Sequence, residues 1–273
     1  MSALSNAGYP KLVLPESDVA RGLLEGRSVY EGYQRGAGLE YGDLRHQIDI
    51  HPLFLEALAV ARDRTLVSVD RIRNIFLILT IFLERLPKQN CIEFGSYRGG
   101  MVFFVTYILG KLFPEAQFWS FDTFEGMPKT DKTLDLHSSG DFNDADLAEI
   151  RAAAEGYGLK NITFIQGRVE DTFPRRLPPD LKFGLAHIDL DIYHAIRHCQ
   201  SSLEEYMVDR GYIIYDDATA STCIGATQAV EEMIAREEAR SEQIFPHYVF
   251  RARPKSLARM IRLKLWRRCW HRM

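Results

Sequence analysis

The sequence lacks several features that mark particular classes of protein. Its longest apolar run, residues 75–83, is far shorter than the roughly 20 residues needed to span a bilayer. The N-terminus has no basic start followed by an apolar core, so we expect no secretory signal. We find no internal repeat, and the four cysteines form no C-x-x-C pair or metal-ligand spacing: Cys91, Cys199, Cys223 and Cys269. These absences favour a cytoplasmic protein with reduced thiols.

Acidic residues are absent from the C-terminal end. Residues 251–273 hold nine of the 34 Lys/Arg and none of the 37 Asp/Glu, so the net charge of −3 conceals an acidic body and a basic tail. The acidic body argues against a nucleic-acid partner. The tail, residues 253–273, also carries Leu, Ile and two Trp, which suits peripheral contact with the inner face of a membrane. Its apolar positions form no single helical stripe, so a protein partner or a solvated tail fits equally well.

Strand and helix patterns alternate from residue 90 onward. Strands are predicted at 90–94, 116–122, 162–167, 182–191 and 211–217, with one or two more in 243–253, and helices at 99–113, 144–158, 194–207 and 225–239. This order predicts an α/β fold with a mostly parallel sheet and helices on both faces. Two further helices are predicted near 52–62 and 68–86. We expect an N-terminal extension of loops and short helices (1–65), a main domain (66–252) and the basic tail (253–273).

Carboxylates stand where two apolar strands end. Asp189 lies in "AHIDLDIYHA", and Asp216 and Asp217 follow the strand "GYIIY". Ligands of parallel sheets bind beyond the carboxyl ends of the strands, so these side chains should converge on one edge. Three unpaired carboxylates would repel one another, which favours a hard divalent cation such as Mg²⁺. The alternative is that some of them cap helices or pair with Arg98 or Arg197.

Two further segments predict a nucleotide-like ligand. "IEFGSYRGG" (92–100) places Glu93 and a glycine turn between a strand and a helix, and glycines let the backbone approach a ligand closely. In "FDTFEGMP" (121–128), Asp122 ends the next strand, where an acid accepts hydrogen bonds from ribose hydroxyls, although an Asp can also cap a helix. Together they favour an adenosyl ligand without separating NAD from S-adenosylmethionine. The absence of G-x-G-x-x-G disfavours an oxidoreductase.

Five segments, in this order and spacing, resemble the macrocin O-methyltransferase (TylF-type) family: "IEFGSYRGG", "DTFEGMP", "IQGRVEDTFP", "HIDLDIY" and "IIYDDA". The resemblance covers roughly residues 65–250. It implies a Rossmann-like class I methyltransferase with a mostly parallel seven-stranded sheet and an N-terminal helical extension. It further implies S-adenosyl-L-methionine and Mg²⁺ as cofactors. Arg168 departs from the family's usual apolar or aromatic residue near the adenine.

The resemblance also assigns residues. It implies cofactor contacts from Glu93, Gly95, Ser96, Arg98, Gly99, Asp122, Thr123, Phe124, Gln166 and Gly167, and metal ligation by Asp189, Asp216 and Asp217. The catalytic residues implied are Asp189 and His137, the latter as the base. His137 lies in residues 125–145, a long polar segment without periodicity that reads as a substrate lid.

The sequence therefore predicts an O-methyltransferase that acts on a hydroxyl of a sugar or glycosylated metabolite. A catechol-like phenolic acceptor and a non-catalytic nucleotide-binding module are the alternatives. The expected partner is a small-molecule or saccharide acceptor, and a homo-oligomer is a further expectation.

Overall fold

The computed structural model describes residues 7–13, 23–24, 27–28, 44–237, 239 and 241–253. Residues 254–273 of the predicted basic tail, and parts of the predicted N-terminal extension, lie outside the described residues. Within that extension, β1 (Leu23–Leu24) and β2 (Arg27–Ser28) form an antiparallel pair. No helix among the described residues has both the length and the apolar character required to cross a bilayer.

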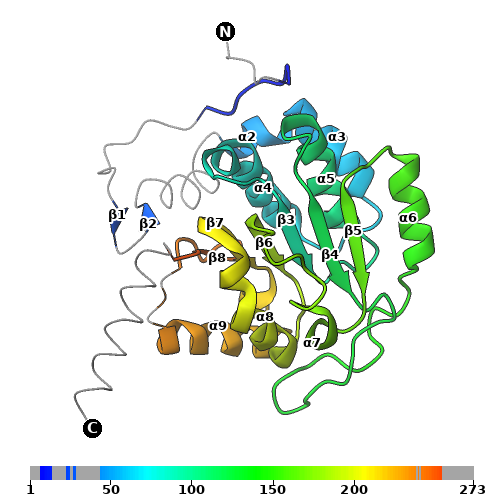
Figure 1. Cartoon of the computed structure of the whole chain (residues 1–273), viewed down its shortest axis with the longest axis vertical. Helices are drawn as coiled ribbons and strands as arrows, with labels where there is room; N and C mark the ends of the chain where they lie inside the picture. Colours follow the sequence, from blue (N-terminus) through cyan, green and yellow to red (C-terminus); the bar gives the residue numbers. More distant parts are fainter. Residues whose placement is uncertain are drawn as a thin grey trace.

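A six-stranded sheet in the order β5-β4-β3-β6-β7-β8 forms the centre of the described part of the chain (Figure 1). Its strands are β3 (Cys91–Phe94), β4 (Phe118–Asp122), β5 (Ile162–Gln166), β6 (Phe183–Ile188), β7 (Met207–Tyr215) and β8 (Tyr248–Arg251). Every neighbouring pair is parallel except β7 and β8. The mostly parallel sheet predicted from the sequence is confirmed.

The strand number differs from the seven that the resemblance implied, since the described residues give this sheet six. The difference lies in the closing segment, 243–253. Only β8 forms there, and Gln243 makes an isolated bridge with Val249. Pro246 interrupts this segment, and proline has no N–H to donate to a ladder.

Helices cover both faces of the sheet (Figure 1). One hydrophobic cluster joins the sheet to α2 (Leu44–Asp49), α3 (Pro52–Ala61), α4 (Val69–Leu77), α5 (Gly100–Leu112) and α6 (Leu147–Gly156), and the other joins it to α7 (Val169–Thr172), α8 (Tyr193–Tyr206) and α9 (Ile224–Glu237). Successive strand residues alternate between the clusters: Cys91 belongs to the first and Ile92 to the second. The short helix α7 was not predicted.

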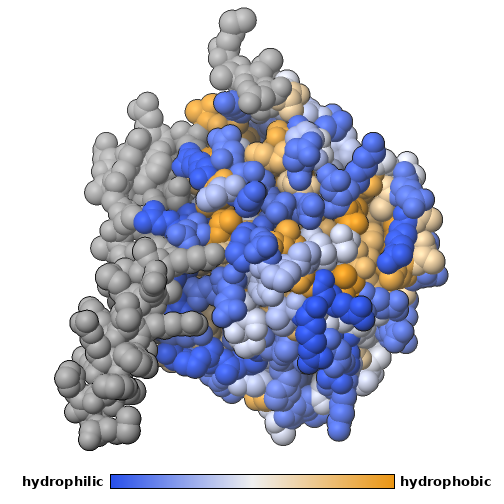
Figure 2. All heavy atoms as spheres, in the orientation of Figure 1, coloured by the Kyte–Doolittle hydropathy of each residue, from blue (hydrophilic) through white to orange (hydrophobic). Residues whose placement is uncertain are grey.

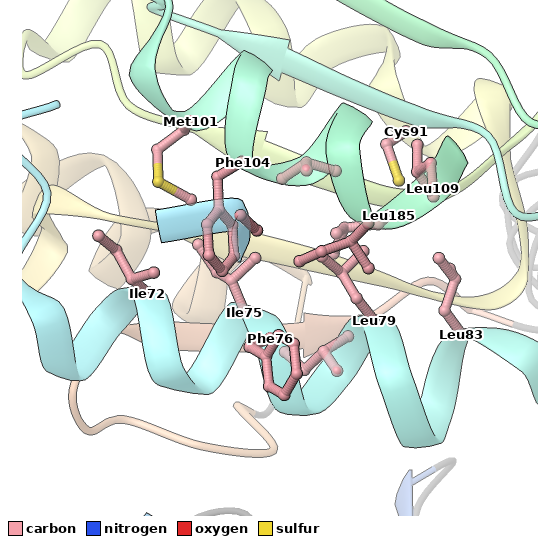
Figure 3. Close-up of a cluster of buried hydrophobic side chains, with 14 of the residues drawn as sticks. Ile72, Ile75, Phe76, Leu79, Leu83, Cys91, Met101, Phe104, Leu109 and Leu185 are labelled. Carbon is pink, nitrogen blue, oxygen red and sulfur yellow. The ribbon is translucent and has the colours of Figure 1, made fainter. Parts of the chain in front are cut away.

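Helix α4 continues through the π-helical turn η1 (Ile78–Phe82) and the 3₁₀ turn η2 (Leu83–Arg85), which matches the helix predicted near 68–86. Its apolar side chains recur every three or four residues and face α5 (Figure 3). Phe76 also meets Phe54 of α3, with ring centroids 5.2 Å apart. The core is therefore continuous across the predicted boundary at residue 65.

The visible outer face is predominantly hydrophilic (Figure 2). Hydrophobic residues occur there as small, separated patches, and no broad apolar area is seen among the described residues in this view.

Candidate active site

Acidic side chains lie side by side beyond the carboxyl ends of neighbouring strands. The Asp189 N–H donates to Phe94 O (2.8 Å), and the Asp216 N–H donates to Ile188 O (2.9 Å), so the sheet's hydrogen bonding continues one residue past β6 and β7. The predicted convergence of these acids on one edge is confirmed.

A cavity of about 200 Å³ opens at this edge. Its lining comes from the segment before α4 and from the loops that follow β3 to β7. Predicted site residues that line it are Glu93, Gly95, Ser96, Asp122, Thr123, Gly167, Asp189, Asp216 and Asp217. Other predicted site residues lie outside this lining: Arg98, Gly99, Phe124, Gln166 and His137.

The four predicted cofactor residues outside the lining have other environments. Arg98 pairs with Asp144 at the surface. Gly99 is the residue before α5 and adopts a left-handed φ of 80°. Phe124 is buried, and Gln166 is exposed. None of the four lines the cavity, so the structure does not bring them together with the predicted cofactor residues that do.

Gly95 fixes the turn after β3. Its φ is +88°, and a Cβ built there would lie 1.6 Å from the carbonyl oxygen of Asp189. Only glycine fits this contact. The glycine turn is therefore pressed directly against the loop that carries Asp189, which places the predicted cofactor and metal residues on adjoining walls of one cavity.

Asp122 organises the same turn. Its Oδ2 accepts hydrogen bonds from the backbone N–H groups of Ser96 (2.6 Å) and Tyr97 (2.9 Å), and its Oδ1 accepts one from Phe124 (2.7 Å). The predicted alternative, a helix cap, is not what forms. The Thr123 hydroxyl lies 3.4 Å from Oδ1, a long contact, so Asp122 holds the turn and still lines the cavity where a ribose hydroxyl would bind.

A buried Glu–His pair underlies the cavity. Glu93 Oε1 lies 2.9 Å from His187 Nδ1. Burial alone would lower the pKa of His187, but its hydrogen bonds with Asp216 and Glu93 raise it to about 10, so the imidazole is protonated at neutral pH. Glu93 Oε2 is buried and has no hydrogen-bond partner among the described residues. Because an unpaired buried carboxylate oxygen is costly, Oε2 fits a cationic or N–H group of a ligand.

Asp216 already has two positively charged neighbours, Arg71 and His187. Arg71 of α4 forms an ion pair with its Oδ2, and His187 Nε2 lies 3.3 Å from its Oδ1. His247 Nδ1 lies 3.7 Å from the same oxygen. Burial would raise the pKa of Asp216, but its hydrogen bond with His187 and the proximity of His247 hold it below its usual range. Repulsion among unpaired carboxylates, the sequence argument for a metal, therefore does not apply to Asp216.

Asp189 and Asp217 have much weaker compensation. The two carboxyl groups hydrogen-bond each other, and the nearest approach of Arg71 Nη1 to Asp217 is 3.9 Å. Loss of water and then repulsion from Asp217 raise the pKa of Asp189 well above its usual value. Burial and the neighbouring Asp191 raise the pKa of Asp217 to about 7. Both shifts oppose the presence of two negative charges at this place, and a bound cation would relieve that.

The donor set fits a divalent cation. Ligand atoms of Asp189 and Asp216 lie within 4.8 Å of one another, and Asp217 adjoins them. His187 stands beside them, but both of its ring nitrogens face carboxylates, Glu93 and Asp216. Carboxylate oxygens are the ligands that Mg²⁺ prefers. Asp189 and Asp217 are the best placed, since a cation would offset their mutual repulsion, whereas Asp216 would have to share its charge with Arg71.

His137 lies near the cavity without lining it. Its segment, residues 125–145, is the long loop that follows β4 (Figure 1). The loop is closed by backbone hydrogen bonds from Met127 N to Asp141 O (2.7 Å) and from Gly140 N to Met127 O (2.9 Å). His137 Nε2 lies 3.6 Å from Asp191 Oδ1, and Asp191 lines the cavity.

Several residues of the site were missed from the sequence. Arg71 meets Asp216 across 145 positions of chain, and nothing near Arg71 in the sequence signals that contact. His247 likewise approaches Asp216 from a distant part of the chain, with no signal in the sequence around it. His187 did carry a signal, because it precedes Asp189 by two residues on a strand and so shares its face.

Comparison with known proteins identifies the family. The sequence profile described as Macrocin-O-methyltransferase (TylF) matches residues 60–240, well over half of the chain. The chain belongs to this family. It is accordingly an S-adenosylmethionine-dependent O-methyltransferase, which confirms the enzyme class predicted from the sequence. A search among proteins of curated function finds no significant match.

Solved structures support the fold. The O-methyltransferase NovP aligns with a TM-score of 0.61 and 22% identity, over 70% of this chain and 82% of that one. The calicheamicin methyltransferase CalS11 gives 0.59 and 18%, over 86% and 99%. The methyltransferase PaMTH1 of Podospora anserina, bound to SAH, gives 0.51 and 15%, over 74% and 87%. At such identities the likeness establishes the class I methyltransferase fold, as predicted.

Proposed function

We propose that the protein methylates a hydroxyl group of a sugar or glycosylated metabolite and needs a divalent cation, preferably Mg²⁺. One observation carries the proposal. The cavity has Glu93 Oε2, which has no hydrogen-bond partner among the described residues, on one wall and the buried Asp189–Asp217 pair on the adjoining wall. A methyl donor and a cation-bound acceptor would therefore meet in one space.

The choice of a sugar rests on chemistry and on family likeness. Neighbouring hydroxyls of a sugar can chelate a cation held by carboxylates. The family takes its description from macrocin. A second structure of CalS11, described as a TDP-rhamnose 3'-O-methyltransferase of calicheamicin biosynthesis, aligns with a TM-score of 0.52 at 17% identity.

The protein's part in the reaction is mainly positioning. When bound, S-adenosylmethionine supplies the methyl group and the cation lowers the pKa of the acceptor hydroxyl. Asp189 and Asp217 would hold the cation, with Asp216 as a third ligand. Glu93, Asp122 and the turn at Gly95 would hold the cofactor and aim its methyl group toward that wall.

The general base stays a proposal. His137 Nε2 is separated from the cavity by Asp191, 3.6 Å away, so a proton would pass through Asp191 or the loop would have to shift. A base placed in this way typically contributes 10²–10⁴-fold.

The test is methyl transfer from labelled S-adenosylmethionine to two acceptor panels, nucleotide sugars with glycosides and catechols, with Mg²⁺ or with EDTA. The proposal expects turnover of a sugar acceptor that EDTA abolishes. Turnover unaffected by EDTA would contradict the proposed need for a cation. A preference for catechols would contradict the proposed sugar acceptor. Homo-oligomerisation and membrane contact by residues 253–273 stay predictions.

A further inference from the structure

A second group of metal-type donors lies beside the carboxylate edge. His137 comes from the loop after β4, Asp191 from the loop between β6 and α8, and Cys223 from the turn before α9. His137 Nε2 lies 3.6 Å from Asp191 Oδ1 and 3.7 Å from Cys223 Sγ, and Sγ lies 3.2 Å from the same Asp191 oxygen. Three separate loops thus aim one nitrogen, one oxygen and one sulfur at a common point.

These separations match tetrahedral zinc. With bonds of about 2.0 Å to nitrogen and oxygen and about 2.3 Å to sulfur, tetrahedral donors stand about 3.3 to 3.6 Å apart. The three measured distances depart from that range by only small amounts. A cation can therefore enter with little movement of any side chain.

The histidine is also oriented as in protein zinc sites. Its other ring nitrogen, Nδ1, lies 3.4 Å from Asp141 Oδ2, and that oxygen accepts the backbone N–H of Ser138 at 2.8 Å. A carboxylate behind a ligating histidine fixes its tautomer and points Nε2 at the metal. The fixed Asp141 is thus a second feature of the site, independent of the three donors.

We propose that His137, Asp191 and Cys223 bind a zinc-class cation, one that prefers imidazole and thiolate over an all-oxygen set. On binding, the Cys223 thiol loses its proton to solvent and the sulfur becomes a ligand. The site would adjoin the cavity, because Asp191 lines it. The cation would tie the loop of residues 125–145 to the loops after β6 and before α9, and would occupy the Nε2 lone pair of His137.

This site is distinct from the one proposed at Asp189 and Asp217. A hard cation such as Mg²⁺ has little affinity for thiolate, whereas Zn²⁺ and Co²⁺ bind it well. Zn²⁺ at the second site would therefore oppose methyl transfer that uses His137, while Mg²⁺ at the first would support it. The binding test below needs neither cofactor nor acceptor, so its outcome is independent of the proposed function.

The test is titration of the metal-free, reduced protein with Co²⁺ in the presence of excess Mg²⁺, followed by near-ultraviolet and visible absorption. The proposal expects one Co²⁺ per chain, a thiolate-to-cobalt charge-transfer band, visible bands of tetrahedral intensity, and displacement by Zn²⁺. Cys223→Ser should abolish the charge-transfer band. Cys269→Ser, which changes a cysteine outside the described residues, should retain it.

Two further variants test the site if Cys223→Ser does not fold. His137→Gln, on the loop, should weaken Co²⁺ binding at least tenfold, and Asp141→Asn should weaken it about tenfold, the lower end for loss of a partner behind a ligating histidine. Absence of a charge-transfer band in the unaltered protein would overturn the proposal. So would a band that survives in Cys223→Ser, or Co²⁺ affinity unchanged in His137→Gln.

Discussion

Asp122 is the last residue of β4 and Asp189 the first residue after β6, and both line the same cavity, yet their surroundings differ. The Asp122 carboxylate accepts three backbone N–H groups of the turns around it. Asp189 faces other carboxyl groups, and its pKa is raised by loss of water and by Asp217. Backbone donors make the first acid part of the scaffold. The charge of Asp189 is disfavoured by its neighbours, and a bound cation would relieve that. Two acids at similar strand ends therefore have different roles, one structural and one in ligand binding.

The largest effect should come from removing the charge of Asp189. Asp189→Asn keeps the shape but loses a cation ligand, so we expect kcat/KM for Mg²⁺-dependent methylation to fall about 10³-fold, from several kcal/mol of lost cation stabilisation. In EDTA, the free energy of unfolding should be unchanged or higher, because repulsion with Asp217 is relieved.

A matched control for this change is Asp146→Asn. Asp146 caps α6 by accepting N–H groups of Ala148 and Glu149, and Asn caps helices as well as Asp does. Activity within twofold of the unaltered protein is expected for the control. Equal losses in both variants would contradict a specific role for Asp189.

The next largest effect should come from the contact between the turn at Gly95 and the loop that carries Asp189. Gly95→Ala places a methyl group 1.6 Å from the Asp189 carbonyl, at a φ that alanine rarely adopts. We expect the free energy of unfolding to fall by about 3 kcal/mol, measured by denaturant titration. Gly110→Ala is the control, since nothing lies within 4 Å of its Cβ position and α5 gains a better helix former. A fully stable Gly95→Ala protein would mean that the walls are not in contact.

Removing Asp122 should act mainly through the scaffold. Asp122→Ala leaves the N–H groups of Ser96 and Tyr97 without their acceptor, so we expect about 2 kcal/mol lower stability. The same change should weaken S-adenosylhomocysteine binding, measured by calorimetry, while leaving Mg²⁺ binding within twofold. If Asp122→Ala and Asp189→Asn had the same pattern of losses, the contrast between them would be wrong.

The protonation of His187 should make stability depend gradually on pH. The pKa of His187 rises from 6.5 to about 10 on folding, so the folded state binds an extra proton between those values. The stabilisation is complete below pH 6.5 and is lost as the pH rises to about 10, by up to about 1.4 kcal/mol per pH unit. Denaturant titrations at pH 7 and pH 9, in EDTA, should show a shallower decline for His187→Asn. Identical declines would show that His187 is not protonated in the fold.

The sequence predicted those parts of the site that depend on strand order. The acids at positions 189, 216 and 217 follow buried strands, and parallel topology brings such positions together whatever the side-chain details. Arg71 could not be predicted, because its contact with Asp216 depends on how α4 crosses the sheet. The second role of Asp122 was missed for a similar reason, since it depends on the path of a turn rather than on residue type.

The most direct test of the account is the binding of Mn²⁺, a Mg²⁺ substitute visible by electron paramagnetic resonance, to the unaltered protein and to Asp217→Asn. The account predicts one bound Mn²⁺ per chain, displaced by excess Mg²⁺, and at least tenfold weaker binding in the variant. Equal affinity in the two proteins, or no Mn²⁺ bound to the unaltered protein, would contradict a cation site at the strand ends.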